Sequence, residues 1–338
     1  MSLNAIGARL LCSLNRYPFH TIWRSVSTIK FIDSGDVQLP ELPKYDYLGS
    51  KYLLTRPVFD STNDRLTQNS RVIAVEGSLL CGKSFLASQL AKHFGMYHIP
   101  DATEDDIYTF HDVEPPFDLR LHNALLPKSA KYYTCEMFWT EPDLLKHGKP
   151  LYLQYQFLIR RLFNYTKGLS TLFNTGRGVV FDRTMFSDLA FNDALFECGY
   201  ISERGHRWFN QNHGEVCVKT WRPHIIVYVK TRPEQIREYI KQRNIPWEVN
   251  GVNLSDKFLE TYSRCLEKNY IVPMSEFCEL LVVDSSTTDV RNEDDCLAIA
   301  RRITEIDLSY DRLLRDDKKF FHWRKNLTRS YGRVMARS

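Results

Sequence analysis

The sequence lacks any long uninterrupted hydrophobic run. No apolar stretch approaches the roughly 18 residues that a membrane-spanning helix needs, so we expect any membrane association to be peripheral and to run through partner proteins. The eight cysteines are scattered, with no Cys-x-x-Cys pair and no histidine at metal-ligand spacing. This pattern argues against a zinc site or a disulfide scaffold and indicates reduced thiols in an intracellular chain.

Outside the N-terminus, basic and acidic side chains balance. The net charge is +4, and residues 1–32 hold four basic side chains and no acid, which leaves the remainder near neutral (+4 − 4 = 0). A nucleic-acid-binding surface needs a basic excess in the body of the chain. We therefore expect no nucleic acid partner.

The N-terminal segment combines spaced arginines, serines and apolar residues. This composition is typical of a mitochondrial presequence, so we expect residues 1–30 to be a transit peptide that leads to the matrix side of the inner membrane. An ordinary flexible N-terminus is the alternative. Residues 31–70 contain three prolines among several aromatic residues without a clean period, and they predict an extended arm against the domain or a partner.

The most informative stretch is Val72–Gly95. The apolar run Val72–Val75 is typical of a buried strand, and GSLLCGKS follows it at residues 77–84. Apolar residues then recur at helical spacing until Gly95. A strand, Gly-x-x-x-x-Gly-Lys-Ser and a helix in this order predict a phosphate-binding P-loop.

Each residue type in this loop has a physical reason. Gly77 and Gly82 permit backbone N–H groups to approach a phosphate closely, and the start of a helix favours an anion. Lys83 would contact the β- and γ-phosphates, and the Ser84 hydroxyl would ligate Mg²⁺. We expect a purine nucleotide (ATP, ADP or a deoxynucleoside phosphate) as the ligand. The expected binding residues are Gly77, Ser78, Cys81, Gly82, Lys83 and Ser84.

Short apolar runs alternate with helical patterns along the rest of the chain. The runs predict a second buried strand at Met96–Pro100 and further strands at Val179–Phe181, Ile225–Val229 and Leu280–Val283. Helices are predicted at Leu151–Phe173, Ser187–Cys198, Glu203–Asn212, Glu234–Arg243, Leu254–Met274 and Asp295–Leu308. Residues 101–130 read as irregular, with an insertion or a loop over the site at Asp112–Ala130, and residues 244–253 read as loop.

This alternation predicts an α/β fold, with a parallel sheet of about five strands and helices on both faces. We expect this domain at residues 71–310, followed by a basic tail at 311–338 that could dock on an acidic partner or lipid head groups. Ligands of such sheets bind at the carboxyl ends of the strands. The P-loop, Asp101 and Asp182-Arg183 all follow strand ends, so we expect them to share one cleft.

These landmarks resemble the deoxynucleoside kinase family. FDRTMFSDLAFNDALFECGYI is similar to the family's acid-Arg-Ser motif, FWTEPDLLKHGKPLYLQYQFLIRRLFNY to its base-contacting helix, and IIVYVKTRPEQIREYIKQR to the strand and helix that lead to its lid. The resemblance implies a P-loop kinase fold and places Gln154 where the family contacts the base. It also implies catalytic places for Asp101, Asp182 and Arg183. Lys241 and Arg243 would be the phosphate-facing cations.

Within that family the chain is similar to the kinase-like accessory subunits of mitochondrial respiratory complex I. The likeness lies in the presequence, the run RNIPWEV, the run VPMSEFCELLVV and the C-terminal extension. It implies other complex I subunits as partners, near the junction of the membrane and matrix arms, and a role in assembly and stability. FAD has been associated with that branch, but no dinucleotide fingerprint occurs here, so the residues give FAD no support.

Several parts of the catalytic apparatus depart from the active kinases. Asp101 stands where they carry Glu, Thr184 replaces their Ser, and the lid run from Asn244 to Trp247 is uncharged. Because transition-state charge is worth several kcal/mol, we expect weak or absent kinase activity. The alternatives are an active mitochondrial deoxynucleoside kinase, which transfers the ATP γ-phosphate to a deoxynucleoside 5′-hydroxyl, and a free nucleotide-binding regulator.

Each candidate residue also has a purely structural interpretation. Asp182 and Arg183 would then be an ion pair at a strand end, and Gln154 would be a buried polar residue bonded to the backbone. Lys241 and Arg243 would lie on a solvated helix face.

Overall fold

The structure, a computed structural model, describes residues 28–32, 66–111 and 113–308. Most of the expected transit peptide, the arm from residue 33 to 65 and the basic tail lie outside the described residues. Within the described chain, no helix is both long enough and apolar enough to cross a membrane.

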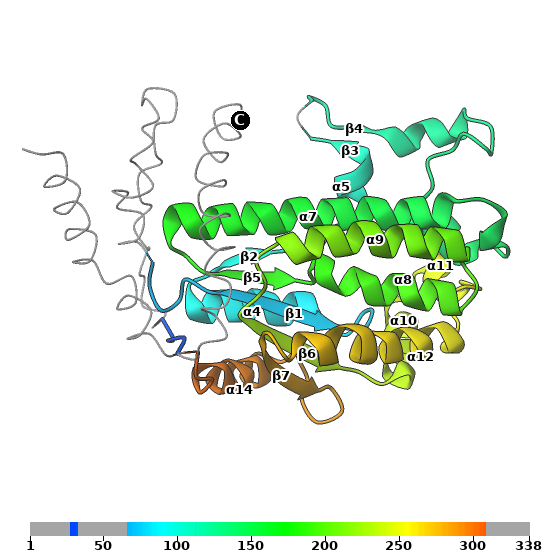
Figure 1. Ribbon diagram of the computed structural model, residues 1–338. Coiled ribbons are helices and arrows are strands. Elements are labelled where there is room, and N and C mark those ends of the chain that lie inside the picture. Colours follow the sequence, from blue (N-terminus) through cyan, green and yellow to red (C-terminus); the bar gives the residue numbers. More distant parts are fainter. Residues whose placement is uncertain (1–27, 33–65, 112, 309–338) are drawn as a thin grey trace, which may run out of the picture.

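A five-stranded parallel sheet forms the centre of the domain (Figure 1), as the sequence predicts. Its strand order is β2-β5-β1-β6-β7, and every neighbouring pair is parallel. The central strand is buried at all six residues because helices cover both faces. The strands are β1 Val72–Gly77, β2 Tyr97–Ile99, β5 Val179–Asp182, β6 Ile225–Lys230 and β7 Glu279–Asp284.

Two hydrophobic clusters lie on opposite faces of the sheet. On one face, Ile73 and Val75 pack against α4 (Lys83–Phe94) and α14 (Glu293–Thr304). On the other face, Val72 and Ala74 belong to the larger cluster that includes the long helices. Those helices are α7 Lys149–Thr175, α8 Asp188–Glu197, α9 Glu203–Lys219 and α12 Asp256–Cys265 (Figure 1).

Shorter elements complete the domain. They are α5 Glu104–Tyr108, β3 Thr109–Phe110, β4 Phe117–Asp118, η2 Leu119–Ala124, α6 Cys135–Thr140, η3 Leu144–Lys146, η4 Met185–Ser187, α10 Pro233–Arg243, α11 Pro246–Val249, the π-helical η5 Leu266–Ile271 and α13 Val272–Met274.

Five predictions from the sequence need correction. The second strand, β2, is half-buried rather than buried because it is an edge strand that pairs only with β5. Residues 101–130 are less irregular than predicted, since Thr103 caps a short helix that leads into the β3–β4 hairpin. The predicted 244–253 loop contains α11, which begins at Pro246, and α9 continues to Lys219.

The fifth correction concerns the predicted helix Leu254–Met274. It begins at Asp256, and its helical winding changes at Leu266 into the π-helical turn η5. A π turn accommodates one extra residue per turn and often occurs at functional sites. Tyr270, which lies in this turn, donates a hydrogen bond to Glu76 at 3.2 Å.

Residues 28–32 pack on the domain and overlap the end of the expected transit peptide. Ile29 is fully buried in the α4–α14 cluster. The Asn69 side chain accepts from the Lys30 backbone N–H at 2.9 Å and donates to its carbonyl at 2.8 Å. The Ile32 N–H donates to the His93 carbonyl at 3.0 Å.

Candidate functional site

The P-loop joins β1 to α4, and both of its glycines stand where a side chain would not fit. A Cβ at Gly77 would lie 2.7 Å from the Val229 carbonyl oxygen of β6 and 2.9 Å from Cys81 Sγ. Gly82 adopts φ +86°, a left-handed conformation that glycine accepts freely, and a Cβ there would meet Val290 at 2.9 Å. The loop therefore has the tight backbone path that phosphate binding needs.

Lys83 lies against the loop that it follows. Its Nζ donates to the Ser78 carbonyl at 2.7 Å and lies 3.7 Å from Cys81 Sγ. Although burial alone lowers the pKa of Lys83, the Cys81 thiol and the Asp182 carboxylate raise it above its ordinary value. The ammonium group therefore stays charged, which is the state that would attract phosphate.

Ser84 and Asp182 bring a hydroxyl and a carboxylate together at the end of β5. The Ser84 Oγ donates to Asp182 Oδ2, and Asp182 Oδ1 is buried without a hydrogen-bond partner among the described residues. Oxygen ligands of this kind suit Mg²⁺, which usually also keeps waters and phosphate oxygens as ligands. The described residues contain no group of three or more His, Cys, Asp or Glu side chains that could hold a metal ion alone. The pair therefore fits a Mg²⁺ that arrives with a nucleotide.

Arg183 is held in a strained backbone conformation. Its φ is +64°, which is uncommon for a residue with a side chain and costs of the order of 1–3 kcal/mol. Its N–H donates to the Val75 carbonyl at 3.0 Å, which ties the turn to β1. Strain of this kind often marks a functional site, because it fixes the direction of a side chain.

Asp188 connects the other candidate residues. Its Oδ1 accepts from Gln154 Nε2 at 3.2 Å, Arg161 NH1 at 2.6 Å and Arg183 NH2 at 3.3 Å. Asp188 is fully buried, and its Oδ2 has no hydrogen-bond partner among the described residues. Gln154 thus bonds a side chain rather than the backbone. Asp188 is thus the shared acceptor of side chains from α7 and from the turn after β5.

Asp101 is ion-paired with Arg161 at two points. Arg161 Nε donates to Asp101 Oδ1 at 2.7 Å, and NH2 donates to Oδ2 at 3.2 Å. Although burial alone raises it, the Arg161 and Arg183 guanidinium groups hold the pKa of Asp101 below its ordinary value. A carboxylate with a lowered pKa is a weak base, and both oxygens of Asp101 already accept hydrogen bonds from Arg161.

Sequence reasoning missed Arg161, Asp188 and Glu76 as parts of the site. Arg161 lies seven residues after Gln154 on the apolar face of α7, and a charge in such a stripe is a usable signal. Glu76 is the last residue but one of β1, where a buried acid is equally unusual.

Glu76 holds the turn after β5 in place. Its Oε1 accepts from the Thr184 N–H at 2.9 Å and the Thr184 hydroxyl at 2.7 Å. Burial raises the pKa of Glu76, although the Thr184 hydrogen bonds and the Arg183 charge oppose the rise. Thr184, which stands where the kinases carry Ser, thus serves to position Asp182 and Arg183.

The two lid cations do not join this cluster. Lys241 and Arg243 lie in the last turn of α10, and both are exposed. Arg243 NH1 pairs with Glu248 Oε1 at 3.2 Å. Within the described residues, neither side chain has a hydrogen bond or ion pair with the P-loop.

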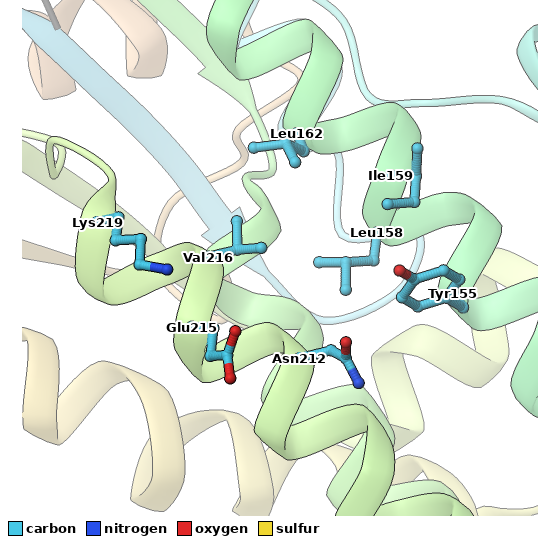
Figure 2. Close-up of a pocket in the computed structure, with 8 residues that line it drawn as sticks. All are labelled: Tyr155, Leu158, Ile159, Leu162, Asn212, Glu215, Val216 and Lys219. Carbon is cyan, nitrogen blue, oxygen red and sulfur yellow. The ribbon is translucent and has the colours of Figure 1, made fainter.

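A separate pocket lies between α7 and α9 (Figure 2). None of the residues expected to bind nucleotide lines it. Figure 2 shows apolar side chains from both helices directed toward the space between them. The lining residues are Tyr155, Leu158, Ile159, Leu162, Asn212, Glu215, Val216 and Lys219.

Comparison with known proteins identifies the family of the chain. The chain belongs to the deoxynucleoside kinase family, because the family model "Deoxynucleoside kinase" matches residues 73–306, more than half of its length. This result confirms the family that the sequence motifs indicate.

The chain is also similar to individual known proteins. It is 26% identical over 283 residues to NADH dehydrogenase (ubiquinone) 1 alpha subcomplex subunit 10, mitochondrial, of Mus musculus, covering 84% of this chain and 75% of that protein. A deoxyguanosine kinase of Dictyostelium discoideum is 22% identical over 224 residues, which cover 66% of this chain and 67% of that protein. The solved structure of a deoxyadenosine kinase of M. mycoides with bound dATP matches with a TM-score of 0.49 and 16% identity. The match covers 68% of this chain and 98% of that chain.

Proposed function

We propose that this protein is an accessory subunit of mitochondrial complex I that holds a nucleotide in a kinase-derived cleft and does not turn it over. The subunit role is supported by the similarity to alpha subcomplex subunit 10 of the mouse enzyme, which covers 84% of the chain. The expected presequence supports a mitochondrial location, on the matrix side of the inner membrane. Its partners would then be other complex I subunits.

The nucleotide ligand is supported by the P-loop. Gly77 and Gly82 permit the tight backbone path that phosphate binding needs, and Lys83 remains charged beside them. Ser84 and Asp182 supply oxygens for Mg²⁺, and Mg²⁺ would neutralise phosphate charge there. On the other side of the cleft, Asp188 Oδ2 is a buried acceptor that suits a base amino group. ATP, ADP or a deoxynucleoside phosphate meets these requirements.

The absence of turnover rests on one observation, the ion pair between Asp101 and Arg161. A sugar hydroxyl must lose a proton to attack a phosphate, and a carboxylate with a lowered pKa and a two-point cation partner accepts it poorly. In addition, Arg243 is paired with Glu248 rather than with the P-loop. Asp101 is therefore not free to accept a proton, and Arg243 does not contact the loop that would hold the phosphates.

The alternative is an active deoxynucleoside kinase of mitochondria. It is favoured by the retained contact between Ser84 and Asp182 and by the buried cluster around Asp188. If the Asp101–Arg161 pair opened on substrate binding, Asp101 would become available as a base.

Blue-native separation of mitochondrial membranes tests the subunit role. We expect the chain to co-migrate with a megadalton assembly that has NADH dehydrogenase activity. Migration only as a small soluble dimer would contradict the subunit role and support the free kinase. Nucleotide released from the denatured assembly, quantified per chain, tests the ligand independently of the subunit role.

A further inference from the structure

The β3–β4 hairpin and the helix η2 after it expose an unusual number of large apolar side chains. Phe110 is 51% exposed, Val113 52%, Phe117 41%, Leu121 72% and Leu125 85%. All five fall within 16 consecutive residues (110 to 125). We call residues 109–111 and 113–126 the apolar hairpin. Clusters of exposed apolar groups on a soluble protein commonly mark interaction surfaces.

The apolar hairpin is fastened to α5 by Arg120. This guanidinium donates to Asp118 Oδ1 at 3.0 Å, pairs with Asp105, and lies 3.5 Å from Glu104 Oε1. Asp118 belongs to the hairpin itself, while Asp105 and Glu104 belong to α5. One arginine thus joins three carboxylates from two elements.

A second set of contacts closes the base of the segment. Asn123 Nδ2 donates to the Tyr132 carbonyl at 3.0 Å, and the Tyr132 N–H donates to Asn123 Oδ1 at 2.8 Å. The Tyr108 hydroxyl donates to the Tyr133 carbonyl at 2.7 Å. The exposed side chains are therefore presented on a preformed element, which reduces the entropy lost on binding.

The hairpin stands on the outer side of α7, away from the sheet (Figure 1). The sequence left two interpretations open for this region, an insertion or a loop over the site. In Figure 1 the hairpin is separated from the central strands by α7, as an insertion would be. Its apolar residues are consequently available to another molecule.

The charge of the region indicates the kind of partner. Residues 101–131 contain seven acidic and three basic side chains, a net charge of −4 (3 − 7). An acidic segment is repelled by the anionic lipids of a membrane surface, whereas lysine and arginine at the rim of a protein groove would attract it. We propose that the apolar hairpin docks into an apolar groove of a partner protein whose rim is basic. This inference rests on the proposed role as an assembly subunit.

A paired set of variants tests the docking surface. In cells that lack the native chain, Leu121→Ser/Leu125→Ser should lower the fraction of full-length protein in the megadalton assembly at least about tenfold. The matched control, Phe163→Ser/Val218→Ser, changes residues that are 62% and 70% exposed on α7 and α9, and should assemble like wild type. Equal thermal midpoints of both variants verify the fold. Assembly of the hairpin variant at the wild-type level would overturn the inference.

Site-specific photo-cross-linking separates this inference from the proposed function. A benzoylphenylalanine placed at Leu125 of the otherwise wild-type chain should cross-link, in mitochondria, to one protein surface bearing apolar residues beside Lys or Arg. A cross-linked partner outside complex I would support the docking surface and contradict the subunit role. Cross-links only to lipid or to a second copy of the chain, or no cross-link, would overturn the docking surface itself.

Discussion

Arg161 holds both carboxylate oxygens of Asp101, through Nε at 2.7 Å and NH2 at 3.2 Å. The same guanidinium donates its NH1 to the buried Asp188 at 2.6 Å. One side chain of α7 thus ties the end of β2 to the start of α8. The proposal that Asp101 does not act as a base rests on this ion pair.

Removing this carboxylate charge should destabilise the protein in a pH-dependent way. Asp101→Asn should lower the free energy of unfolding at pH 7 by about 1–3 kcal/mol, because it leaves a buried arginine with one charged partner fewer. The pKa of Asp101 in the folded protein lies below its ordinary value of about 3.9. The ion pair therefore contributes its full stability above the ordinary pKa, and this contribution is lost as the pH falls through the lowered pKa. Urea unfolding at several pH values should show the two proteins converging in acid. A constant difference would contradict the ion-pair account.

The P-loop glycine nearest β6 should not tolerate a methyl group. Gly77→Ala places a Cβ 2.7 Å from the Val229 carbonyl oxygen, and should cost about 1–3 kcal/mol of stability and weaken nucleotide binding. Gly214→Ala in α9, where no atom lies within 4 Å of the new Cβ, is the control and should add about 0.5–1 kcal/mol. Thermal unfolding and nucleotide titration measure both effects. Equal behaviour of the two variants would show that the close approach is unimportant.

Lys83 should control how much nucleotide stays with the purified protein. Lys83→Ala removes the one charge that the loop itself provides and should lower the amount of retained nucleotide at least about tenfold. Lys92→Ala, at an exposed position in the last turn of α4, should leave it unchanged. Chromatography of the nucleotide released by denaturation gives the occupancy. Unchanged occupancy in Lys83→Ala would mean that the loop is vestigial.

Residues 28–32 should belong to the mature protein. A chain that begins at residue 33 loses the buried Ile29 and the Asn69–Lys30 hydrogen bonds, and should be about 2–4 kcal/mol less stable than one that begins at residue 28. Lys30→Ala, an exposed side chain, is the control and should have little effect. We therefore expect presequence removal to occur before residue 28. N-terminal sequencing of the mitochondrial protein checks this directly, and a mature N-terminus after Ile29 would contradict it.

The sheet was predictable because buried parallel strands read as short continuous apolar runs. Ile225–Val229 and Val72–Val75 gave such runs, and each lies in a strand of the structure. The errors fell where local signals were weak. The edge strand β2 resembles a buried one in composition, and α11 is a single turn that begins at Pro246.

The site was only partly predictable. The P-loop and Asp182-Arg183 are contiguous motifs, so their spacing alone indicates their chemistry. Arg161 and Asp188 are separated by 27 residues and meet only because α7 packs against the turn before α8. Arg161 stands out in the sequence as a charge on an apolar helix face, but its pairing with Asp101, on which the proposed lack of turnover rests, could not be seen there.

The most direct test of the central claim is an assay with γ-labelled ATP and each deoxynucleoside in turn. We predict that the purified protein retains labelled nucleotide and transfers no phosphate above the level of Lys83→Ala. Transfer to any deoxynucleoside at a rate on the order of 1 s⁻¹ or faster, as ordinary enzymes achieve, would contradict the account and establish an active kinase.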